Sequence, residues 1–207
     1  MQDNQRTLRK EYIFEGKGLH SGKKVKMTLC PAPEGSGIRF LREDLGPDAV
    51  IEAVADYVTT TQRGTTLEKG EIRVSTAEHL LSAFSGMGVD NALVRLDSLE
   101  VPILDGSALP YVRAIAADGL QEQDAPRTYY SVKEEVTVED PASGSRITIS
   151  PAEDFSLDLT IDFNSHVLGV QEIHYDGAVD YASEVAPCRT FVFFHELEFL
   201  FNNNLIK

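Results

Sequence analysis

The amino-acid sequence predicts an α+β fold with one complete domain followed by a second domain that is incomplete. Alternation of apolar and polar residues indicates strands across residues 6–74, and two helical patterns follow before residue 120. A polar stretch, QEQDAPRT, then precedes a new series of strand patterns that has no comparable helix pair after it. We therefore divide the chain into domains at residues 1–122 and 127–207.

The first helix is predicted by its start signal and by its apolar face. Ser75 is a good N-cap residue, and Glu78 follows three positions later, at the spacing of a capping box. Leu80, Leu81 and Phe84 then form an apolar face, and the glycines after them end the helix.

A second helix and further strands complete the expected elements. NALVRLDS and EVPIL indicate strands, and the helix SALPYVRAIAAD has Asp105 as its N-cap and Gly119 as its end. After the polar stretch, YYSVKEEVTVED, SRITISPA and FSLDLTIDF indicate strands, and residues 185–207 begin as a strand and continue as a short apolar helix. Because a sheet must cover its apolar face, this second half lacks elements that it needs.

The composition argues against several classes of partner. A net charge of −14 disfavours nucleic acid and anionic lipid surfaces, which attract Lys and Arg. No apolar run approaches the roughly 20 residues that span a bilayer, and the first residues lack the apolar core of a signal peptide. We therefore expect a cytoplasmic protein without a transmembrane segment. Cys30 and Cys188 have no metal-ligand spacing and are expected to be reduced thiols.

One pair of residues has a setting that suggests catalysis. Glu78 and His79 lie in the first turn of the predicted helix, where free N–H groups and the helix dipole favour an anionic intermediate. A carboxylate there could act as a base on a metal-bound water. The structural alternatives are that Glu78 only completes the capping box and that His79 is a packed histidine.

Two further segments are ambiguous from their residues alone. GKGLHSG follows a strand but lacks the GxxxxGK[ST] pattern and a following helix, so we expect a hairpin turn there and not a phosphate loop. FVFFHELEFLF is either a core element or the wall of a groove for a lipid tail.

Several segments together resemble one known family. GKGLHSG, RVSTAEHLLSAFSGMGVDNALV, PILDGSALPYV, FSLDLTIDF and APCRTFVF are similar, in the same order, to UDP-3-O-acyl-N-acetylglucosamine deacetylase, a zinc hydrolase of lipopolysaccharide (lipid A) synthesis. The resemblance spans essentially the whole chain, and ASGSRITISP and RTFVF look most like the Bacteroidetes branch. In that branch a hydroxyacyl-carrier-protein dehydratase is often fused to the deacetylase. The implied fold is two similar α+β domains, each a helix pair packed on a mostly antiparallel sheet, with the second incomplete in this chain.

The resemblance also implies an activity and a set of site residues. The activity is metal-assisted hydrolysis of the N-acetyl group of UDP-3-O-acyl-N-acetylglucosamine, the committing step of lipid A synthesis. Glu78 is implied as the general base, His79 as a zinc ligand, and Thr190 as the hydrogen-bond donor to the tetrahedral oxyanion. The other implied residues line the substrate site: Leu19 and His20 in a strand turn, Phe191 beside Thr190, Asp162 and Phe163 near the uridine, and residues from Phe193 onward along the acyl-chain passage.

The family's remaining zinc ligands do not occur before Lys207. The family uses a second His and an Asp in an HKxxD-like segment, and a later His as general acid. Because a catalytic zinc takes about three protein ligands, the 207 residues are expected to be an amino-terminal portion that is inactive alone. The alternatives are a non-catalytic module that binds a UDP-sugar lipid and a purely structural domain. Zinc content and binding of the UDP-sugar lipid separate the three.

Overall fold

The computed structural model describes residues 3–202, apart from the side chains of His195, Glu198, Phe199 and Phe201. The expected α+β class is confirmed, with mostly antiparallel sheets and few helices. Contacts divide the chain into a first unit, which comprises the described residues up to Arg127 and those from Tyr181 onward, and a second unit, Thr128–Asp180. None of the helices within residues 3–202 is long and apolar enough to cross a membrane.

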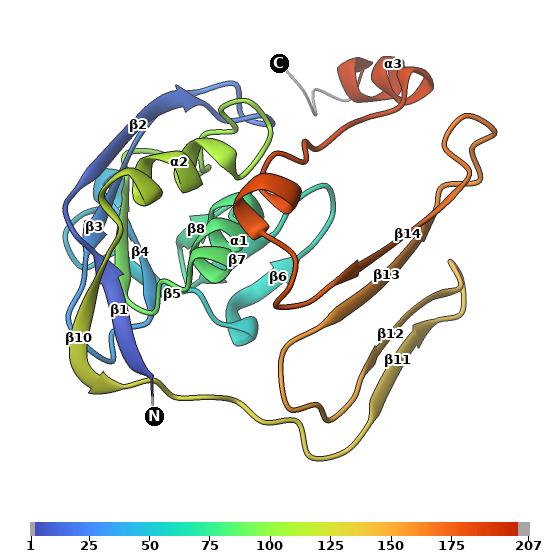
Figure 1. Cartoon of the computed structure of the whole chain (residues 1–207). Helices are drawn as coiled ribbons and strands as arrows, with labels where there is room; N and C mark the ends of the chain where they lie inside the picture. The colour runs from blue at the N-terminus through green and yellow to red at the C-terminus, as the bar shows by residue number, and fades with distance from the viewer. Residues whose placement is uncertain (1–2, 203–207) are drawn as a thin grey trace. The chain divides into compact units, whose positions relative to one another are not determined.

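The first unit contains a five-stranded sheet (Figure 1). Within it, β4 and β9 pair in parallel and the other neighbours are antiparallel. Along β9, alternate residues are fully buried, as expected for a strand with one face in the core. The strand order is β2 (Tyr12–Lys17), β3 (Lys24–Pro31), β9 (Ala92–Leu96), β4 (Ile38–Arg42) and β5 (Val50–Glu52).

Two helices of this unit form where the sequence predicts them. α1 (Glu78–Met87) ends at Gly88, which is left-handed with φ of 72°, and α2 (Leu109–Asp118) ends at Gly119. On α2, the ring of Tyr111 meets Phe14 of β2 edge to face, with centroids 5.0 Å apart, so α2 packs on that edge of the sheet. The helices bury residues at helical spacing, namely Leu80, Ala83 and Phe84 on α1 and Tyr111, Val112 and Ile115 on α2.

A three-stranded antiparallel sheet leads into α1. Its strands are β6 (Val58–Thr60), β7 (Thr66–Lys69) and β8 (Ile72–Val74), and β8 ends four residues before α1 begins. Short 3₁₀ helices at Glu43–Leu45 and Ala55–Tyr57 connect the strands before it. The loop between β6 and β7 is thereby placed beside the start of α1, where it contributes to the site described below.

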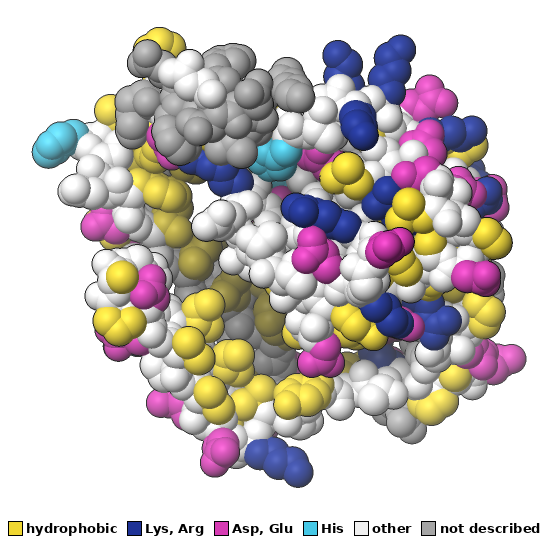
Figure 2. Space-filling model, turned by 180° about the vertical axis from the view of Figure 1, so that it is seen from behind, with side chains coloured by type: hydrophobic (Ala, Val, Ile, Leu, Met, Phe, Trp, Pro, Cys, Tyr) yellow, Lys and Arg dark blue, Asp and Glu magenta, His cyan; other side chains and the backbone are white. Residues whose placement is uncertain are grey.

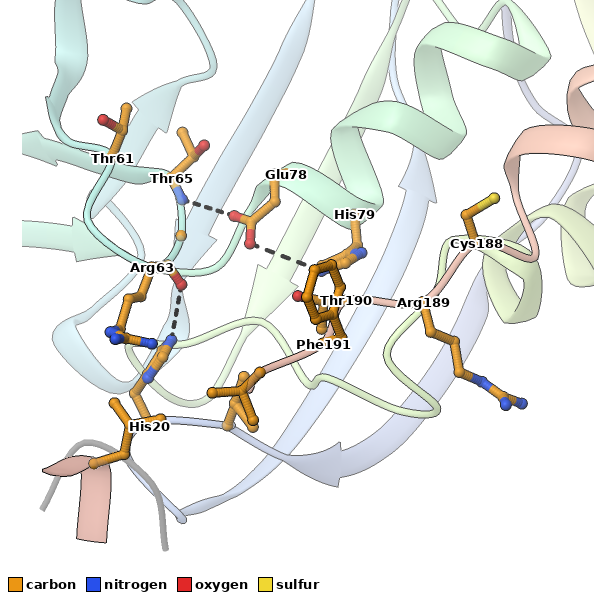
Figure 3. Close-up of a pocket in the computed structure, with 14 residues that line it drawn as sticks. His20, Thr61, Arg63, Thr65, Glu78, His79, Cys188, Arg189, Thr190 and Phe191 are labelled. Atoms are coloured by element: carbon orange, nitrogen blue, oxygen red, sulfur yellow. Dashed lines mark hydrogen bonds and ion pairs between the residues drawn. The ribbon is translucent and has the colours of Figure 1, made fainter. Parts of the chain in front are cut away.

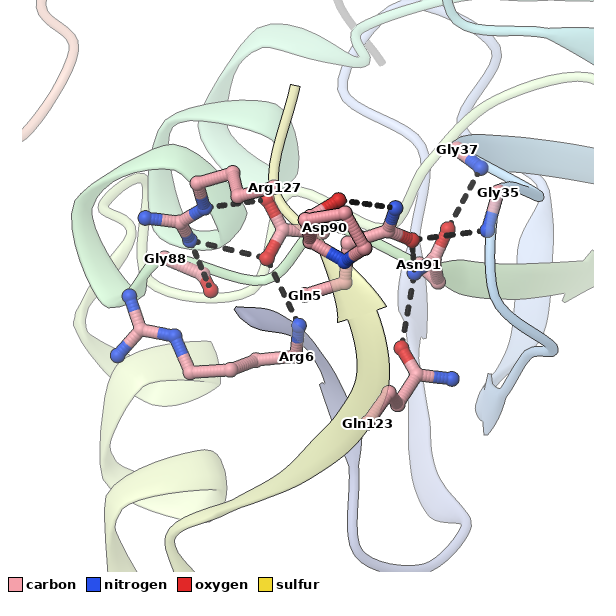
Figure 4. Close-up of polar contacts among 10 residues, drawn as sticks. Gln5, Arg6, Gly35, Gly37, Gly88, Asp90, Asn91, Gln123 and Arg127 are labelled. Carbon is pink, nitrogen blue, oxygen red and sulfur yellow. Dashed lines mark hydrogen bonds and ion pairs between the residues drawn. The ribbon is translucent and has the colours of Figure 1, made fainter. Parts of the chain in front are cut away.

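The stretch QEQDAPRT is not the polar linker that its composition predicts. β10 (Leu120–Pro126) pairs antiparallel with β1 (Asn4–Leu8). Polar side chains here make hydrogen bonds inside the unit: Asn91, which is 1% exposed, donates to the side chains of Gln5 and Gln123 (Figure 4). The polar residues of this stretch therefore belong to a two-stranded ribbon, β1 with β10, in which their side chains serve as hydrogen-bond partners for the buried amide of Asn91.

Arg127 joins this ribbon to the end of α1. Its guanidinium contacts both carboxylate oxygens of Asp90, at 2.8 and 2.9 Å, and donates to the carbonyl oxygen of Gly88 at 3.0 Å (Figure 4). A two-point pair of this kind fixes orientation as well as distance. The expected first-domain boundary at residue 122 thus falls within β10, and the first unit's amino-terminal part extends to Arg127.

EVPIL is not the strand that the sequence predicts. Glu100 makes one isolated bridge to Ser75, and Val101–Ile103 lie outside any strand. Pro102 has no N–H for a ladder, and its carbonyl oxygen accepts a hydrogen bond from the hydroxyl of Tyr111 at 2.8 Å.

The second unit consists of two hairpins. β11 (Val136–Asp140) pairs with β12 (Ser145–Ile149), and β13 (Leu157–Asp162) pairs with β14 (Val170–Tyr175). This confirms the three strands predicted there, β11, β12 and β13, whereas β14 is a strand that the sequence interpretation missed. Apolar side chains lie open on these strands, as the space-filling view in Figure 2 shows, and Ile147 is 69% exposed. Two-stranded hairpins are marginal on their own, and a second domain with a covering helix pair remains a prediction.

The described residues from Tyr181 onward group with the first unit. Tyr181 begins a short π-helix, Tyr181–Val185, and its hydroxyl lies 2.7 Å from that of Ser82 on α1. Its ring lies so close to Gly86 that a Cβ there would be 2.3 Å away. The sequence-based division, which keeps 127–207 together, therefore differs from the grouping by contacts.

The apolar helix predicted near the end is present as α3, Phe194–Asn202, but residues 185–193, which the sequence predicts to begin as a strand, contain no strand. Leu200 on this helix is 2% exposed. The expected acyl-chain passage includes residues 203–207, which lie outside the described part of the chain.

Candidate active site

Glu78 is the first residue of α1, and its carboxylate does not cap the helix. The N-cap is Ala77, and no side chain makes a capping hydrogen bond. Instead, Oε2 of Glu78 accepts the backbone N–H of Thr65 at 2.7 Å. The capping-box prediction is wrong because Ser75 is held in a strand-like bridge, where its N–H donates to the carbonyl oxygen of Leu99 at 2.9 Å.

His79 lies beside Glu78 at one cavity. Nε2 of His79 is 3.8 Å from Oε1 of Glu78, and both side chains line a cavity of about 700 Å³ (Figure 3). The side chain of His79 is 20% exposed and that of Glu78 is 35% exposed, so a ligand can reach both. A cavity of this size suits a small-molecule site.

The glycine-rich turn between β2 and β3 contributes Leu19 and His20 to the same cavity. Backbone hydrogen bonds from Gly18 to Lys23 and from Gly22 to Gly18 close the turn, as expected for a hairpin. The Nε2–H of His20 donates to the carbonyl oxygen of Arg63 at 3.0 Å (Figure 3). This hydrogen bond joins the turn to the loop between β6 and β7.

That loop is a part of the site that the sequence interpretation missed. Thr61, Arg63, Gly64 and Thr65 line the cavity. Gly64 has φ of 155°, and a Cβ on it would lie 3.3 Å from Oε1 of Glu78. The loop contacts Glu78 through the backbone N–H of Thr65. Because every residue except proline has a backbone N–H, the residue types of this loop could not predict the contact.

The segment before α3 brings Thr190 and Phe191 to the cavity. The backbone N–H of Thr190 donates to the carbonyl oxygen of Gly106 at 2.9 Å. The neighbouring Arg189 lies 3.7 Å from the carboxylate of Asp105. These two contacts anchor the segment on the turn before α2. Six of the eight expected site residues thus line one cavity: Leu19, His20, Glu78, His79, Thr190 and Phe191.

The two expected uridine residues lie in the second unit. Asp162 is the last residue of β13, and its carboxylate accepts the N–H of Asn164 at 2.8 Å. Phe163 follows it and is 46% exposed. Their part in a uridine site remains a prediction.

The described residues alone do not complete a zinc site. Among the side chains that the structure describes, which leave out His195 and Glu198, no three His, Cys, Asp or Glu are grouped so that they could hold a metal ion. His79 offers one imidazole at the cavity, whereas a catalytic zinc takes about three protein ligands.

Comparison with known proteins gives one consistent result. The family model described as "LpxC: UDP-3-O-acyl N-acetylglycosamine deacetylase" matches residues 5–207. The "Bifunctional enzyme LpxC/FabZ" of Porphyromonas gingivalis is 46% identical over 98% of this chain and 44% of its own length. The protein of that name from Bacteroides thetaiotaomicron is 40% identical over the same shares. The "UDP-3-O-acyl-N-acetylglucosamine deacetylase" of Pseudomonas entomophila is 46% identical over 97% of this chain and 67% of its own length.

The chain therefore spans less than half the length of the bifunctional relatives and about two thirds of the monofunctional one. The match itself covers nearly every residue of the chain, and it includes the segments that carry all eight expected site residues. The chain belongs to the UDP-3-O-acyl N-acetylglycosamine deacetylase family.

Proposed function

We propose that the gene product containing this chain is a zinc-dependent deacetylase that removes the N-acetyl group of UDP-3-O-acyl-N-acetylglucosamine, the committing step of lipid A synthesis, in the cytoplasm. The observation that carries the proposal is the pairing of Glu78 and His79 at one accessible cavity in a chain of this family. An acid and an imidazole 3.8 Å apart at a helix amino terminus suit hydrolysis through an anionic intermediate.

Glu78 is the proposed general base. The Thr65 N–H holds Oε2 and thereby fixes the carboxylate, while Oε1 lies on the side of His79. A carboxylate held in this way can take a proton from a water molecule in the cavity as that water attacks the acetamide carbonyl, while the family resemblance assigns protonation of the leaving amine to the later His. A positioned base of this kind contributes about 10²–10⁴-fold to turnover.

Thr190 is the proposed donor to the oxyanion of the tetrahedral intermediate. Its backbone is fixed by the hydrogen bond to Gly106, and its side chain lines the cavity that Glu78 lines. A hydroxyl that is positioned before the reaction stabilises developing negative charge without reorganisation.

His79 is the proposed zinc ligand of this chain. Zinc supplies Lewis acidity toward the amide carbonyl and toward water when it is bound. Because His79 fills one ligand position, we propose that the remaining protein ligands come from outside the described residues. For the same reason we propose that the 207-residue chain alone is inactive.

The remaining proposed substrate residues are assigned to the two ends of the substrate. Leu19 and Phe191 give the cavity apolar walls, and Phe191 meets Phe193 edge to face at 5.4 Å. Leu200 of α3 extends this lining and suits the acyl chain. Asp162 and Phe163 are the proposed uridine contacts, since an exposed ring can stack on uracil.

Given the bifunctional relatives, we also propose that a hydroxyacyl-carrier-protein dehydratase is fused to the deacetylase in the full-length gene product.

The test is acetate release from UDP-3-O-acyl-N-acetylglucosamine by the full-length gene product. Turnover that stops on chelation and returns with added zinc is expected. Binding of the substrate without any acetate release, at full zinc occupancy, would contradict the proposal and favour the non-catalytic binding module. Release that is unaffected by complete removal of zinc would contradict the metal dependence.

A further inference from the structure

Glu100 is a completely buried carboxylate beside the candidate active site. Its exposed fraction is 0%, yet it is neither a helix cap nor part of an ion pair among the described residues. Oε1 accepts the backbone N–H of His20 at 2.9 Å, and Oε2 accepts the backbone N–H of Ser21 at 2.8 Å. Burying a carboxylate without a cation costs free energy unless hydrogen bonds compensate it. The N–H groups of His20 and Ser21 supply this compensation.

The hydrogen bonds outweigh the cost of burial for this group. Burial alone would raise the pKa of Glu100, but hydrogen bonds from His20, Ser21 and Thr76 bring the pKa below its usual value. Gly18, in the same turn, is shaped to this carboxylate: a Cβ there would lie 2.3 Å from Oε2 of Glu100. The turn that carries Leu19 and His20 is therefore built around the ionised Glu100.

The same carboxylate also holds the entry to α1. The hydroxyl of Thr76 donates to Oε1 of Glu100 at 3.1 Å. Thr76 is 2% exposed and has φ of 58°, a left-handed conformation that is unfavourable for a β-branched residue. This strained position lies immediately before α1, two residues ahead of Glu78.

We propose that Glu100 is a positioning residue of this active site: it joins the His20 turn to the Thr76–Glu78 entry of α1 and thereby sets the place of His20 relative to Glu78. The proposal rests on the proposed function for its kinetic consequence but not for its structural one. His20 and Glu78 have no direct hydrogen bond to each other among the described contacts, and the loop that contacts both does so through Arg63 and Thr65. Glu100 therefore provides a further connection between the His20 turn and the Thr76–Glu78 entry of α1, through its hydrogen bonds to His20, Ser21 and Thr76.

The kinetic test compares Glu100→Gln with Glu71→Gln in the full-length gene product. Glu71 is exposed in the turn between β7 and β8, so its substitution controls for loss of one negative charge. In Glu100→Gln, an amide NH₂ faces a backbone N–H, and we expect kcat to fall by about tenfold or more with KM changed less, since small displacements are costly in catalysis. Zinc content should be unchanged. An unchanged kcat in folded Glu100→Gln would overturn the proposal.

A milder pair of variants keeps the test usable if Glu100→Gln does not fold. Thr76→Val replaces the hydroxyl that reaches Glu100 with a methyl group, whereas Thr76→Ser keeps the hydroxyl. We expect Thr76→Ser to retain more turnover than Thr76→Val, and also to be the less strained of the two at this φ. Equal kcat values for the two variants and the wild type would overturn the link from Glu100 to Glu78.

Amide hydrogen exchange tests the structural part without any catalytic assay. The N–H groups of His20 and Ser21 should exchange at least about tenfold faster in Glu100→Gln than in the wild type, while that of Val94 in β9 should not change. Equal exchange rates at His20 and Ser21 would overturn the proposal. If the wild type releases no acetate but these rates change as expected, the proposed function fails and the anchoring role of Glu100 stands.

Discussion

The backbone N–H of Thr65 donates to Oε2 of Glu78 across 2.7 Å and links the β6–β7 loop to the first residue of α1. One carboxylate oxygen is thereby held in place, and the other lies 3.8 Å from Nε2 of His79. The arrangement removes the helix-cap alternative that the sequence leaves open, because Glu78 makes no capping hydrogen bond. The proposed role of Glu78 as a base is tested by the turnover of Glu78→Gln.

Replacing His79 should remove metal from the full-length gene product. We expect His79→Ala to lower bound zinc well below one equivalent, because it deletes one of about three protein ligands. Zinc per protein is measured by atomic absorption after dialysis. His166→Ala is the matched control, since His166 is exposed in the second unit. One full equivalent of zinc in His79→Ala would exclude His79 from the metal site.

Adding a methyl group at Gly86 should destabilise the first unit. A Cβ there would lie 2.3 Å from the ring of Tyr181, and overpacking of this kind costs about 1–3 kcal/mol. Alanine's better helix propensity offsets up to about 1 kcal/mol of that cost. We therefore expect Gly86→Ala to lower the free energy of unfolding in urea.

The control for this prediction is Gly177→Ala, where a Cβ would meet nothing within 4 Å. That change should leave the free energy of unfolding within about 0.5 kcal/mol of the wild type. A Gly86→Ala protein as stable as the Gly177→Ala protein would mean that Tyr181 does not pack against α1.

The 207-residue chain should associate with itself. Both hairpins of the second unit expose apolar side chains, and such surfaces drive association. Val138 and Ile147 face each other across β11 and β12 and are 67% and 69% exposed, so the double change to Thr should shift sedimentation toward the monomer. Thr137→Ser, at a neighbouring position of β11, should not. A wild-type chain that sediments as a monomer at micromolar concentration and melts cooperatively would contradict this prediction.

His174 should titrate above the ordinary histidine pKa of about 6.5. Its Nδ1 lies 2.6 Å from Asp158 and its Nε2 lies 3.2 Å from Asp176, and these hydrogen bonds raise the pKa of the imidazole. Because the folded pKa is raised, the added stability is fully present below the unfolded pKa and is lost as pH rises through the folded pKa. Protection of the β13–β14 amides should fall over the same window.

NMR titration of the His174 ring measures this directly, and Asp158→Asn should bring the midpoint down. A His174 midpoint no higher than the ordinary histidine value of about 6.5 would show that neither carboxylate holds the imidazolium in solution.

The elements that a local pattern encodes could be predicted from the sequence. The alternation along β9 and the helical spacing of Leu80 and Phe84 each follow from which residues must face a core. Glycine at positions 88 and 119 marks the helix ends because few other residues take a left-handed backbone. The β2–β3 turn was predicted on the same basis.

The elements that depend on distant partners could not be predicted in this way. β10 looks like a linker because its polar side chains find their partners on β1 and at Asn91, far away in the chain. The capping box fails because the Leu99 backbone holds Ser75, 24 positions away from it in sequence.

The same limit applies to the site. Glu78 and His79 were candidates because of their place on a helix, but the sequence carries no sign that Thr65 serves Glu78 through its backbone. Glu100 did carry a signal, since it is an acid between Leu99 and Val101 in an apolar stretch. A charged residue in such a run is expected to need buried hydrogen-bond partners, which is what the structure contains.

The most direct test of the central claim is the turnover of Glu78→Gln in the full-length gene product, measured as acetate released from UDP-3-O-acyl-N-acetylglucosamine with zinc determined in the same sample. Glutamine keeps the shape and can still accept the Thr65 N–H, but it cannot take a proton from water. We predict full zinc occupancy, an unchanged melting temperature within error, and a kcat lower by about two or more orders of magnitude. A zinc-loaded Glu78→Gln protein with near-normal kcat would contradict the account.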